Sequence, residues 1–226
     1  MDAYERYWIG FGDLHGDSSR VPDIPGLAEA DGVILTGDLT TRGDRDQAGR
    51  ILDAVAMVNP RILAQIGNMD TRSVENLLDE RGCNVHGRGL ELAPGVGLVA
   101  VGWSTPTPFG TPSEIPDARL AEILERAHAQ ARSAGPFGTL LLVAHDPPRG
   151  TRVDRVAPGM HVGSPSVRAY IERVQPDVCL SGHIHEARAT DAIGRTTVIN
   201  PGMLGQGGYA VIGLKDGRLH GELRTL

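Results

Sequence analysis

The chain has 226 residues, of which 40% are hydrophobic and 22% are charged. These values are ordinary for one globular domain, which we expect to span residues 1–226, and they exclude a low-complexity protein. The formal net charge of −6 disfavours anionic partners, so we expect neither tight binding to nucleic acid nor association with a membrane.

The N-terminal segment and the cysteines bear on the cellular compartment. Residues 1–7 are polar and charged, unlike the basic and then apolar start of a secretion signal. No run approaches the roughly 18 apolar residues that a membrane-spanning helix needs. Cys83 and Cys179 lie far apart, and nothing in their spacing indicates a disulfide framework. We therefore expect a cytoplasmic protein with two reduced thiols.

Five short apolar runs end in polar side chains. They lack the alternation of apolar and polar residues, which is typical of strands covered on both faces. The expected strands and the polar residues after them are Tyr7–Phe11 with Asp13 and His15, Gly32–Leu35 with Asp38, Ile62–Ile66 with Asn68, Leu140–Ala144 with His145, and Val178–Leu180 with His183 and His185.

Segments with helical features separate these strands. The longest has apolar residues at helical spacing, and the others are bounded by capping residues, glycine or proline. The expected helices are Arg45–Val58, Thr71–Glu80, Ser113–Ser133 and Ser164–Val174.

The remaining apolar runs predict β-hairpins. Pro94-Gly95 separates the runs 90–93 and 96–101, and a turn at 215–217 separates the runs 209–214 and 218–223. Two further strands are expected at 187–190 and 196–199. Together these elements predict an α/β protein with two packed sheets and helices outside.

The polar residues at the strand ends are expected to form one cluster, because strand ends on one side of an α/β sheet converge. Their imidazole, carboxylate and amide groups suit Mn²⁺, Fe or Zn²⁺ better than Ca²⁺ or Mg²⁺. Seven ligands exceed the need of one ion with open positions and suit two ions that share a carboxylate. The candidate metal ligands are Asp13, His15, Asp38, Asn68, His145, His183 and His185.

The motifs, in this order, resemble those of the calcineurin-like metallophosphoesterases. The resemblance rests on Asp13-Leu-His15, Gly37-Asp38, Gly67-Asn68, His145 and Gly182-His183-Ile-His185, and it spans residues 13–185. Each motif alone is weak, whereas five in the family's order, each after an apolar run, are specific.

The resemblance implies a four-layer αββα sandwich of two mixed β-sheets. It also implies two divalent ions, with Mn²⁺ expected and Fe, Zn²⁺ and Ni²⁺ as alternatives. A metal-bridging hydroxide would attack phosphorus in line, so that Asp38 is both ligand and catalytic residue. The implied ligands are Asp13, His15 and His185 for the first ion, Asn68, His145 and His183 for the second, and Asp38 between them.

The third motif departs from the pattern of many relatives. It reads Gly67-Asn68-Met69-Asp70, where those relatives have a histidine after the asparagine. That histidine is thought to protonate the leaving oxygen or to stabilise the transition state, and a thioether cannot donate a proton. The small bacterial and archaeal branch of the family commonly lacks this histidine, and some of its members remain phosphodiesterases. We therefore expect an active enzyme that handles the leaving group differently.

Three further residues are candidates, either for donating a proton to the leaving oxygen or for supporting the metal ligands. His161, in a glycine-flanked loop, is the candidate catalytic proton donor; the alternative is a loop histidine that binds substrate or nothing. Asp70 and Asp146 would stay ionised beside two cations, so we expect each to orient a histidine ligand.

Substrate contacts are expected from one arginine and two loops. Arg149, with Asn68, is the candidate phosphate contact, whereas surface solvation is favoured for Arg42. The loops 102–117 and 146–165 are expected to set substrate choice. Trp103 and Phe109 could stack on a base, although packing is the favoured interpretation for both.

Three functions remain open at this stage. The first is a phosphodiesterase acting on a small phosphoester such as a nucleotide, because a leaving group of low pKa needs no protonation. The second is a phosphomonoesterase with the same metals. The third is a binding scaffold, which Met69 supports and the retained ligand set opposes. The family resemblance also makes a homo-oligomer an expectation, since relatives often form dimers or tetramers.

Overall fold

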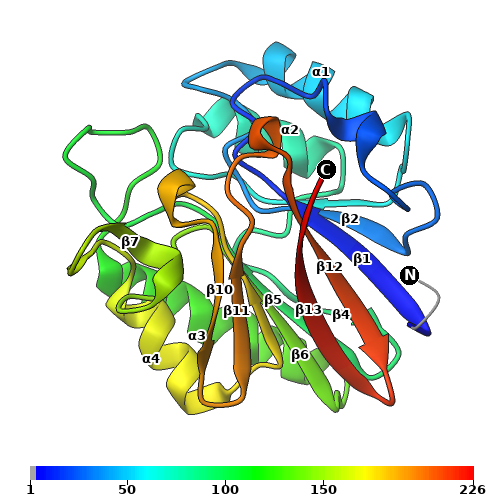
Figure 1. Ribbon diagram of the computed structural model, residues 1–226, viewed down its shortest axis with the longest axis vertical. Coiled ribbons are helices and arrows are strands. Elements are labelled where there is room, and N and C mark those ends of the chain that lie inside the picture. The colour runs from blue at the N-terminus through cyan, green and yellow to red at the C-terminus, as the bar shows by residue number, and fades with distance from the viewer. Residues whose placement is uncertain (1–3) are drawn as a thin grey trace.

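The computed structural model describes residues 4–226 and has two β-sheets packed face to face between two pairs of helices. In Figure 1 the pair α1 and α2 lies at the top, the pair α3 and α4 lies at the lower left, and the strands run between them.

The first sheet has five strands in the order β13-β12-β1-β2-β3. Its parallel strands are β1 (Arg6–Phe11), β2 (Gly32–Leu35) and β3 (Ile62–Ala64). The hairpin of β12 (Gly208–Lys215) and β13 (Arg218–Thr225) extends the sheet on the antiparallel side of β1.

The second sheet has six strands in the order β10-β11-β9-β6-β5-β4. Its four central strands are parallel, and an antiparallel strand closes each edge. The strands are β4 (Gly89–Ala93), β5 (Val96–Val101), β6 (Thr139–Ala144), β9 (Val178–Leu180), β10 (Ala189–Ile193) and β11 (Thr196–Asn200).

The helices cover the outer faces of the sheets. They are α1 (Arg45–Ala56), α2 (Arg72–Glu80), α3 (Asp117–Ala134) and α4 (Pro165–Val174). The side chain of Asp44 accepts the first free amides of α1, and that of Ser164 accepts the amide of Val167 in α4. Short 3₁₀ turns lie at Val21–Asp23, Arg152–Asp154, His185–Ala187 and Leu204–Gln206.

Both faces of each sheet are buried, which explains the absence of alternation in the strand sequences. The inner faces share a core that includes Ile34, Leu141, Leu180 and Ile212. The outer face of the first sheet packs on α1 and α2, and that of the second packs on α3 and α4. The predicted four-layer αββα sandwich is therefore confirmed.

The loop before α3 is longer than predicted. The helix begins at Asp117 rather than at Ser113, because the backbone just before it binds other segments. The amide of Ser113 donates to the carbonyl of Asn68, and that of Ile115 donates to the carbonyl of Ser104. The Asn68 loop and the loop 102–117 are thereby joined.

The loop 146–165 contains a hairpin that the sequence did not predict. It is formed by β7 (Arg155–Ala157) and β8 (Met160–His161), which are short and mostly exposed. Strand β3 also ends two residues earlier than predicted, and β10 starts after a 3₁₀ turn rather than at residue 187.

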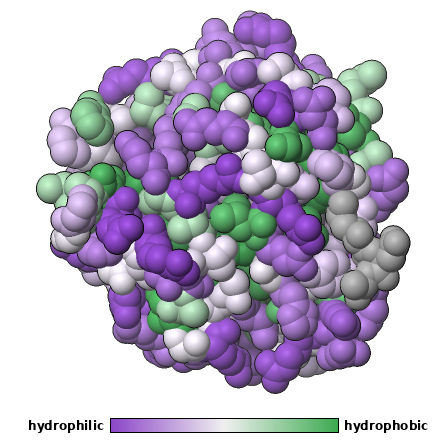
Figure 2. Space-filling view, in the orientation of Figure 1, coloured by the Kyte–Doolittle hydropathy of each residue, from purple (hydrophilic) through white to green (hydrophobic). Residues whose placement is uncertain are grey.

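The surface and the thiols add two observations. Hydrophobic residues are scattered among hydrophilic ones on the face drawn in Figure 2. No helix within residues 4–226 has the length and apolar character needed to cross a membrane. Cys83 and Cys179 are free and buried, as predicted.

The packing of α3 on β4 depends on Gly89. A Cβ atom at this position would lie 1.7 Å from the carbonyl oxygen of Ala127 and 2.6 Å from the amide nitrogen of Ala131. Because both are backbone atoms, Gly89→Ala should push α3 away and lower the free energy of unfolding by about 1–3 kcal/mol. Urea denaturation measures this. Gly205→Ala, whose Cβ would meet no atom within 4 Å, is the control, and equal stability of the two variants would contradict the argument.

Candidate metal centre

The predicted ligands come from the carboxyl ends of parallel strands in both sheets. Asp13, Asp38 and Asn68 follow β1, β2 and β3 of the first sheet, whereas His145 follows β6 of the second. His183 and His185 follow β9. Because the two sheets are stacked, these strand ends meet, and the structure brings all seven predicted ligands together.

One group of potential ligand atoms consists of Asp13, His15, Asp38 and His185, whose donor atoms all lie within 4.8 Å of one another. The Nε2 atoms of His15 and His185 are 3.0 Å apart. His15 Nε2 lies 3.8 Å from Asp38 Oδ2, and His185 Nε2 lies 3.4 Å from Asp13 Oδ1. Two imidazole nitrogens and two carboxylates therefore face a common point.

The second group consists of Asp38, His145 and His183, again within 4.8 Å. The side-chain oxygen of Asn68 lies 3.0 Å from His145 Nε2 and 2.7 Å from His183 Nδ1. Asp38 Oδ2 is 3.6 Å from His145 Nε2. Asp38 thus belongs to both groups, in the position that the resemblance implies for a bridging ligand.

Backbone and hydroxyl oxygens orient two of the imidazoles. His145 Nδ1 lies 3.0 Å from the carbonyl oxygen of Thr36, so this nitrogen donates and Nε2 faces the cluster. His15 Nδ1 lies 3.0 Å from Thr41 Oγ1, which leaves its Nε2 toward Asp38. Such partners fix the ring position of a metal-binding histidine.

The glycines of the motifs make room for the ligand side chains. A Cβ atom on Gly67 would lie 2.1 Å from Asp38 Oδ1 and 2.5 Å from His145 Cε1. A Cβ atom on Gly182 would lie 2.7 Å from Asp13 Oδ2. The Gly-Asn and Gly-His pairs are therefore requirements of packing around the cluster.

The backbone of the cluster is strained. Asp13, His15, Asp38 and His183 have φ angles of 49°, 49°, 51° and 71°. The backbone of residues other than glycine rarely adopts this left-handed conformation, and such strain concentrates at functional sites.

The charges of the cluster fit bound cations. Asp13 and Asp38 are buried, and within residues 4–226 their ion-pair partners are histidines only. Burying two carboxylates without a permanent positive charge is costly. Mixed carboxylate, imidazole and amide donors suit divalent transition metals. The residues present therefore fit divalent metal ions.

The pKa values of the cluster show how strongly its members interact. Burial opposes ionisation of Asp38, but His145 and His15 beside it lower its pKa. Burial likewise opposes protonation of His145, yet the Asp38 carboxylate raises the pKa of that imidazole to about 9. Burial lowers the pKa of His15 and of His183. A metal ion that binds His145 must therefore displace a proton.

Asp70 holds the backbone of the cluster. Its carboxylate accepts hydrogen bonds from the amides of Leu39, Thr40 and Gly67, and from the Thr40 hydroxyl. Burial and the charge of Asp38 raise its pKa to about 7. The prediction that Asp70 orients a histidine is therefore corrected, because both of its oxygens bind backbone that carries the ligands.

Asp146 likewise binds a loop instead of an imidazole. Its Oδ2 accepts the amide and the hydroxyl of Thr105, both at 2.8 Å, and ties the loop 102–117 to the end of β6. Its Oδ1 is buried and has no partner within residues 4–226. The charges of Asp146 and His183 influence each other, so the two lie close, but no hydrogen bond joins them.

Asn68 is oriented by a residue that the sequence did not single out. Its amide nitrogen donates to Thr111 Oγ1 at 3.0 Å, which turns the amide oxygen toward His145 and His183. Glu114 in turn accepts from the amide and hydroxyl of Thr111. The loop before α3 therefore positions a predicted ligand.

Met69 keeps a backbone role. Its amide donates to Asp38 Oδ1 at 2.8 Å, and this bond does not depend on the side chain. The thioether lines a cavity of about 940 Å³ that also contains His161, Arg149 and most of the predicted ligands.

The arginines differ in their surroundings. Arg149 is exposed at the cavity, and its guanidinium has no partner within residues 4–226. The guanidinium of Arg42 donates to the carbonyl oxygens of Phe109 and Gly110, so this residue supports the loop 102–117 rather than being merely solvated.

The two aromatic residues of that loop also differ. Trp103 packs against hydrophobic residues and lies 4.5 Å from the His86 ring, which confirms the packing interpretation. Phe109 is 79% exposed and lines the cavity, so packing is not its role.

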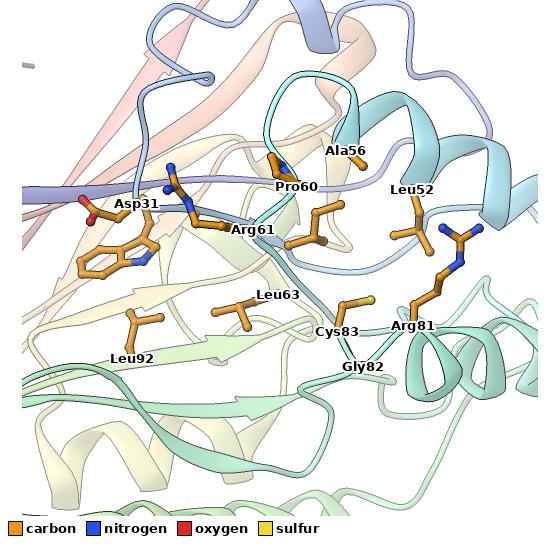
Figure 3. A pocket seen from close by; sticks show the side chains of 13 residues that line it. Asp31, Leu52, Ala56, Pro60, Arg61, Leu63, Arg81, Gly82, Cys83 and Leu92 are labelled. Carbon is orange, nitrogen blue, oxygen red and sulfur yellow. The ribbon is translucent and has the colours of Figure 1, made fainter.

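A second hollow lies away from the cluster (Figure 3). It measures about 430 Å³ and is lined by side chains such as Asp31, Arg61, Leu63 and Leu92. It contains none of the predicted site residues. Its single thiol, Cys83, has a pKa raised by burial, which makes it a poor nucleophile.

Comparison with known proteins agrees with the geometry. The sequence pattern of the family described as calcineurin-like phosphoesterase matches residues 9–187. An uncharacterized protein of Methanocaldococcus jannaschii is 32% identical over 203 residues, which cover 85% of this chain and 86% of that protein. The chain therefore belongs to the calcineurin-like phosphoesterase family.

Solved structures share the fold. TT1561 of Thermus thermophilus has a TM-score of 0.69 and 18% identity, with 96% of this chain and 98% of that chain covered. A dimetal phosphatase from Danio rerio has a TM-score of 0.63 and 12% identity, with 98% and 96% covered. At these identities the likeness shows the fold alone.

The shared position of Asp38 leads to a prediction about metal affinity. Asp38→Asn keeps the shape of the side chain but removes the charge that both ligand groups share. We expect the chelator-treated variant to bind Mn²⁺ at least about tenfold more weakly than the wild type. Substituting residues that only hydrogen-bond to metal ligands already lowers metal affinity by that factor. Isothermal titration calorimetry measures the affinity. Asp53→Asn, which alters an exposed ion pair with Arg81, is the control, and unchanged affinity in Asp38→Asn would contradict the assignment.

Proposed function

We propose that the protein is a dinuclear metal-dependent phosphodiesterase that hydrolyses a small organic phosphodiester. The observation that carries the proposal is the pair of ligand groups that share the buried carboxylate of Asp38. A pair of sites with a common carboxylate is the arrangement that two-metal phosphoesterases use. The name of the structural neighbour from Danio rerio, a dimetal phosphatase, points in the same direction.

Asp13, His15 and His185 would hold one ion, Asn68, His145 and His183 the other, and Asp38 both. When bound, divalent ions supply an activated water and stabilise charge on the phosphoryl oxygens. Mn²⁺ is the proposed ion, and Fe, Zn²⁺ or Ni²⁺ would suit the same donors.

Protein groups at the cavity supply the remaining contacts with substrate. The guanidinium of Arg149 is free to bind a phosphoryl oxygen, for which its planar donors are suited. Asn68, which lines the same cavity, is the second proposed contact with the phosphoryl group. His161, which lines the cavity, is the proposed donor of a proton to the leaving oxygen in place of the histidine absent at Met69.

The rim of the cavity suits an organic ester group of the substrate. Within residues 4–226 five large hydrophobic residues are exposed, and four of them line this cavity: Phe109, Val156, Met160 and Val162. Exposed apolar residues that gather at one cavity mark a binding site for an apolar group. A phosphodiester places an organic group on each side of phosphorus, and one of them would contact this rim.

Other sequence predictions stay predictions. They concern a single domain over residues 1–226, a cytoplasmic location, a homo-oligomer and the absence of a nucleic-acid partner. Phosphomonoesterase activity and a scaffold role on the same fold are decided by the assay that follows.

The reaction is tested with bis-p-nitrophenyl phosphate and p-nitrophenyl phosphate side by side. We expect chelator-treated protein to be inactive, Mn²⁺ to restore cleavage of the diester in preference to the monoester, and Asp38→Asn to abolish it. Release of p-nitrophenol measures the rate. Preference for the monoester would overturn the assignment of substrate class, and no turnover with any divalent metal would favour a scaffold.

Phe109 provides a test of the apolar rim. Removing its ring in Phe109→Ala should raise KM for a diester with an aromatic ester group by about fivefold, equivalent to ~1 kcal/mol of lost ring contact, with kcat little changed. KM for a phosphodiester whose two ester groups are both methyl should not rise. Met57→Ala, which removes an exposed hydrophobic residue elsewhere, is the control. Equal effects on aromatic and methyl esters would contradict a contact with the ring.

A further inference from the structure

A buried carboxylate outside the predicted ligand set lies beneath the hairpin of β7 and β8. Asp154 follows the end of β6 by ten residues, closes the 3₁₀ turn Arg152–Asp154, and is fully buried. Its oxygens accept the amides of Gly150, Thr151 and Gly163 at 2.8–3.1 Å. Within residues 4–226 it has no lysine or arginine partner, and its one ion-pair contact is His161.

The contact with His161 is short and directional. His161 Nδ1 lies 2.7 Å from Asp154 Oδ1. Burial alone would raise the pKa of Asp154, but the bonds from His161 and the amides lower it, so the carboxylate is ionised and can only accept. The proton of this bond therefore belongs to Nδ1, and Nε2 on the opposite side of the ring points away from Asp154.

The position of the ring distinguishes it from every other imidazole of the cavity. The cavity is lined by His15, His161, His183 and His185, and three of these are predicted metal ligands. The His161 side chain is 30% exposed and lines the cavity, so a molecule bound there can reach it. Met69 lines the same cavity and has no proton to give.

We propose that Asp154 is a positioning residue that holds the His161 ring with Nε2 toward the leaving oxygen of the substrate. This inference rests on the proposed phosphodiesterase function. It assigns the acid function missing at Met69 to a dyad supplied by the loop 146–165.

The proton balance of the step is simple. Water adds its oxygen to phosphorus and releases one proton to the solvent. The bond between phosphorus and the leaving oxygen breaks, and its electron pair stays on that oxygen. The oxygen takes the proton from Nε2 of His161, and the neutral imidazole regains a proton from the solvent. Asp154 stays ionised throughout, as buried carboxylates behind catalytic histidines do.

A different explanation is that Asp154 merely fixes the loop, since it accepts three backbone amides. The two explanations differ in their dependence on the leaving group. A leaving group of low pKa departs without a proton, whereas one of high pKa needs the acid. A loop defect slows both reactions, and loss of the acid slows only the second.

The experiment uses Mn²⁺-loaded protein and two diesters, methyl p-nitrophenyl phosphate and methyl phenyl phosphate, with kcat and KM measured for each. We expect His161→Gln to lower kcat for the phenyl ester by about 10²-fold and for the p-nitrophenyl ester by less than about threefold. Asp154→Asn should show the same selectivity with a smaller loss. The double variant should equal His161→Gln alone, because Asp154 acts through His161.

The controls separate folding from catalysis. His161→Gln keeps an N–H group that can donate to Asp154, so we expect the loop to stay intact in this variant. It therefore tests the proposal even if Asp154→Asn does not fold. Asp191→Asn is matched to Asp154→Asn, because Asp191 accepts the amide of Arg152 in the same loop without touching His161. It should leave the ratio of the two rates unchanged.

Each outcome bears on one of the two claims. Equal losses for both esters, or losses in Asp154→Asn that add to those of His161→Gln, would show that Asp154 is only structural. An unchanged rate for the phenyl ester in His161→Gln would overturn the dyad. No turnover by the wild type of either ester would overturn the proposed function itself and this inference with it.

Discussion

The hydrogen bond between His145 Nδ1 and the carbonyl oxygen of Thr36 joins the two sheets at the point where the candidate metal centre forms. His145 belongs to the second sheet and Thr36 to the first, and a second link runs from the His183 amide to the Asp13 carboxylate. Other polar contacts between the sheets lie elsewhere, such as the bond from the Leu219 amide to Thr139 Oγ1, whereas these two lie among the ligands themselves. Apolar contacts set a distance between sheets, whereas directional bonds fix the angles that a ligand set needs. The contacts that align the two sheets at this end therefore also align the ligand set.

The strand ends were predictable from the sequence because a strand buried on both faces leaves an uninterrupted apolar run. Asp38 and His145 could be placed at the end of such runs, and parallel strands bring their ends together. The partners that orient these side chains were not predictable. Thr36 acts through a backbone carbonyl, which every residue type has, and Asp70 acts on backbone amides of its own loop and of the loop after β2. A backbone group leaves no mark in the sequence, so only the tertiary structure reveals the contact.

Asp154 is an instructive exception. The stretch Thr151-Arg-Val-Asp154 has the spacing of a capping box, and the structure has both reciprocal bonds of that motif. This signal was available in the sequence and indicated a short turn with a fixed acidic side chain. The sequence did not indicate that His161 lies against that carboxylate, because the hairpin between them is short and has no buried face. The start of α3 was misplaced for a related reason, since Ser113 and Ile115 pair with the site loops rather than continuing the helix.

Met69 matters to the structure of the site through its backbone rather than its side chain. Its amide binds Asp38 and its carbonyl accepts the amide of Arg42, so the backbone holds both the shared carboxylate and the loop that carries Phe109. Neither bond involves the side chain, so the residue type was free to change without disturbing the metal cluster. The thioether adds apolar surface to a cavity whose rim is already apolar. The proposed acid, His161, lines the same cavity beside Met160 and Val162 of that rim. In this proposal the acid and the apolar contacts with substrate come from the same two loops, while the strand ends supply the metal ligands.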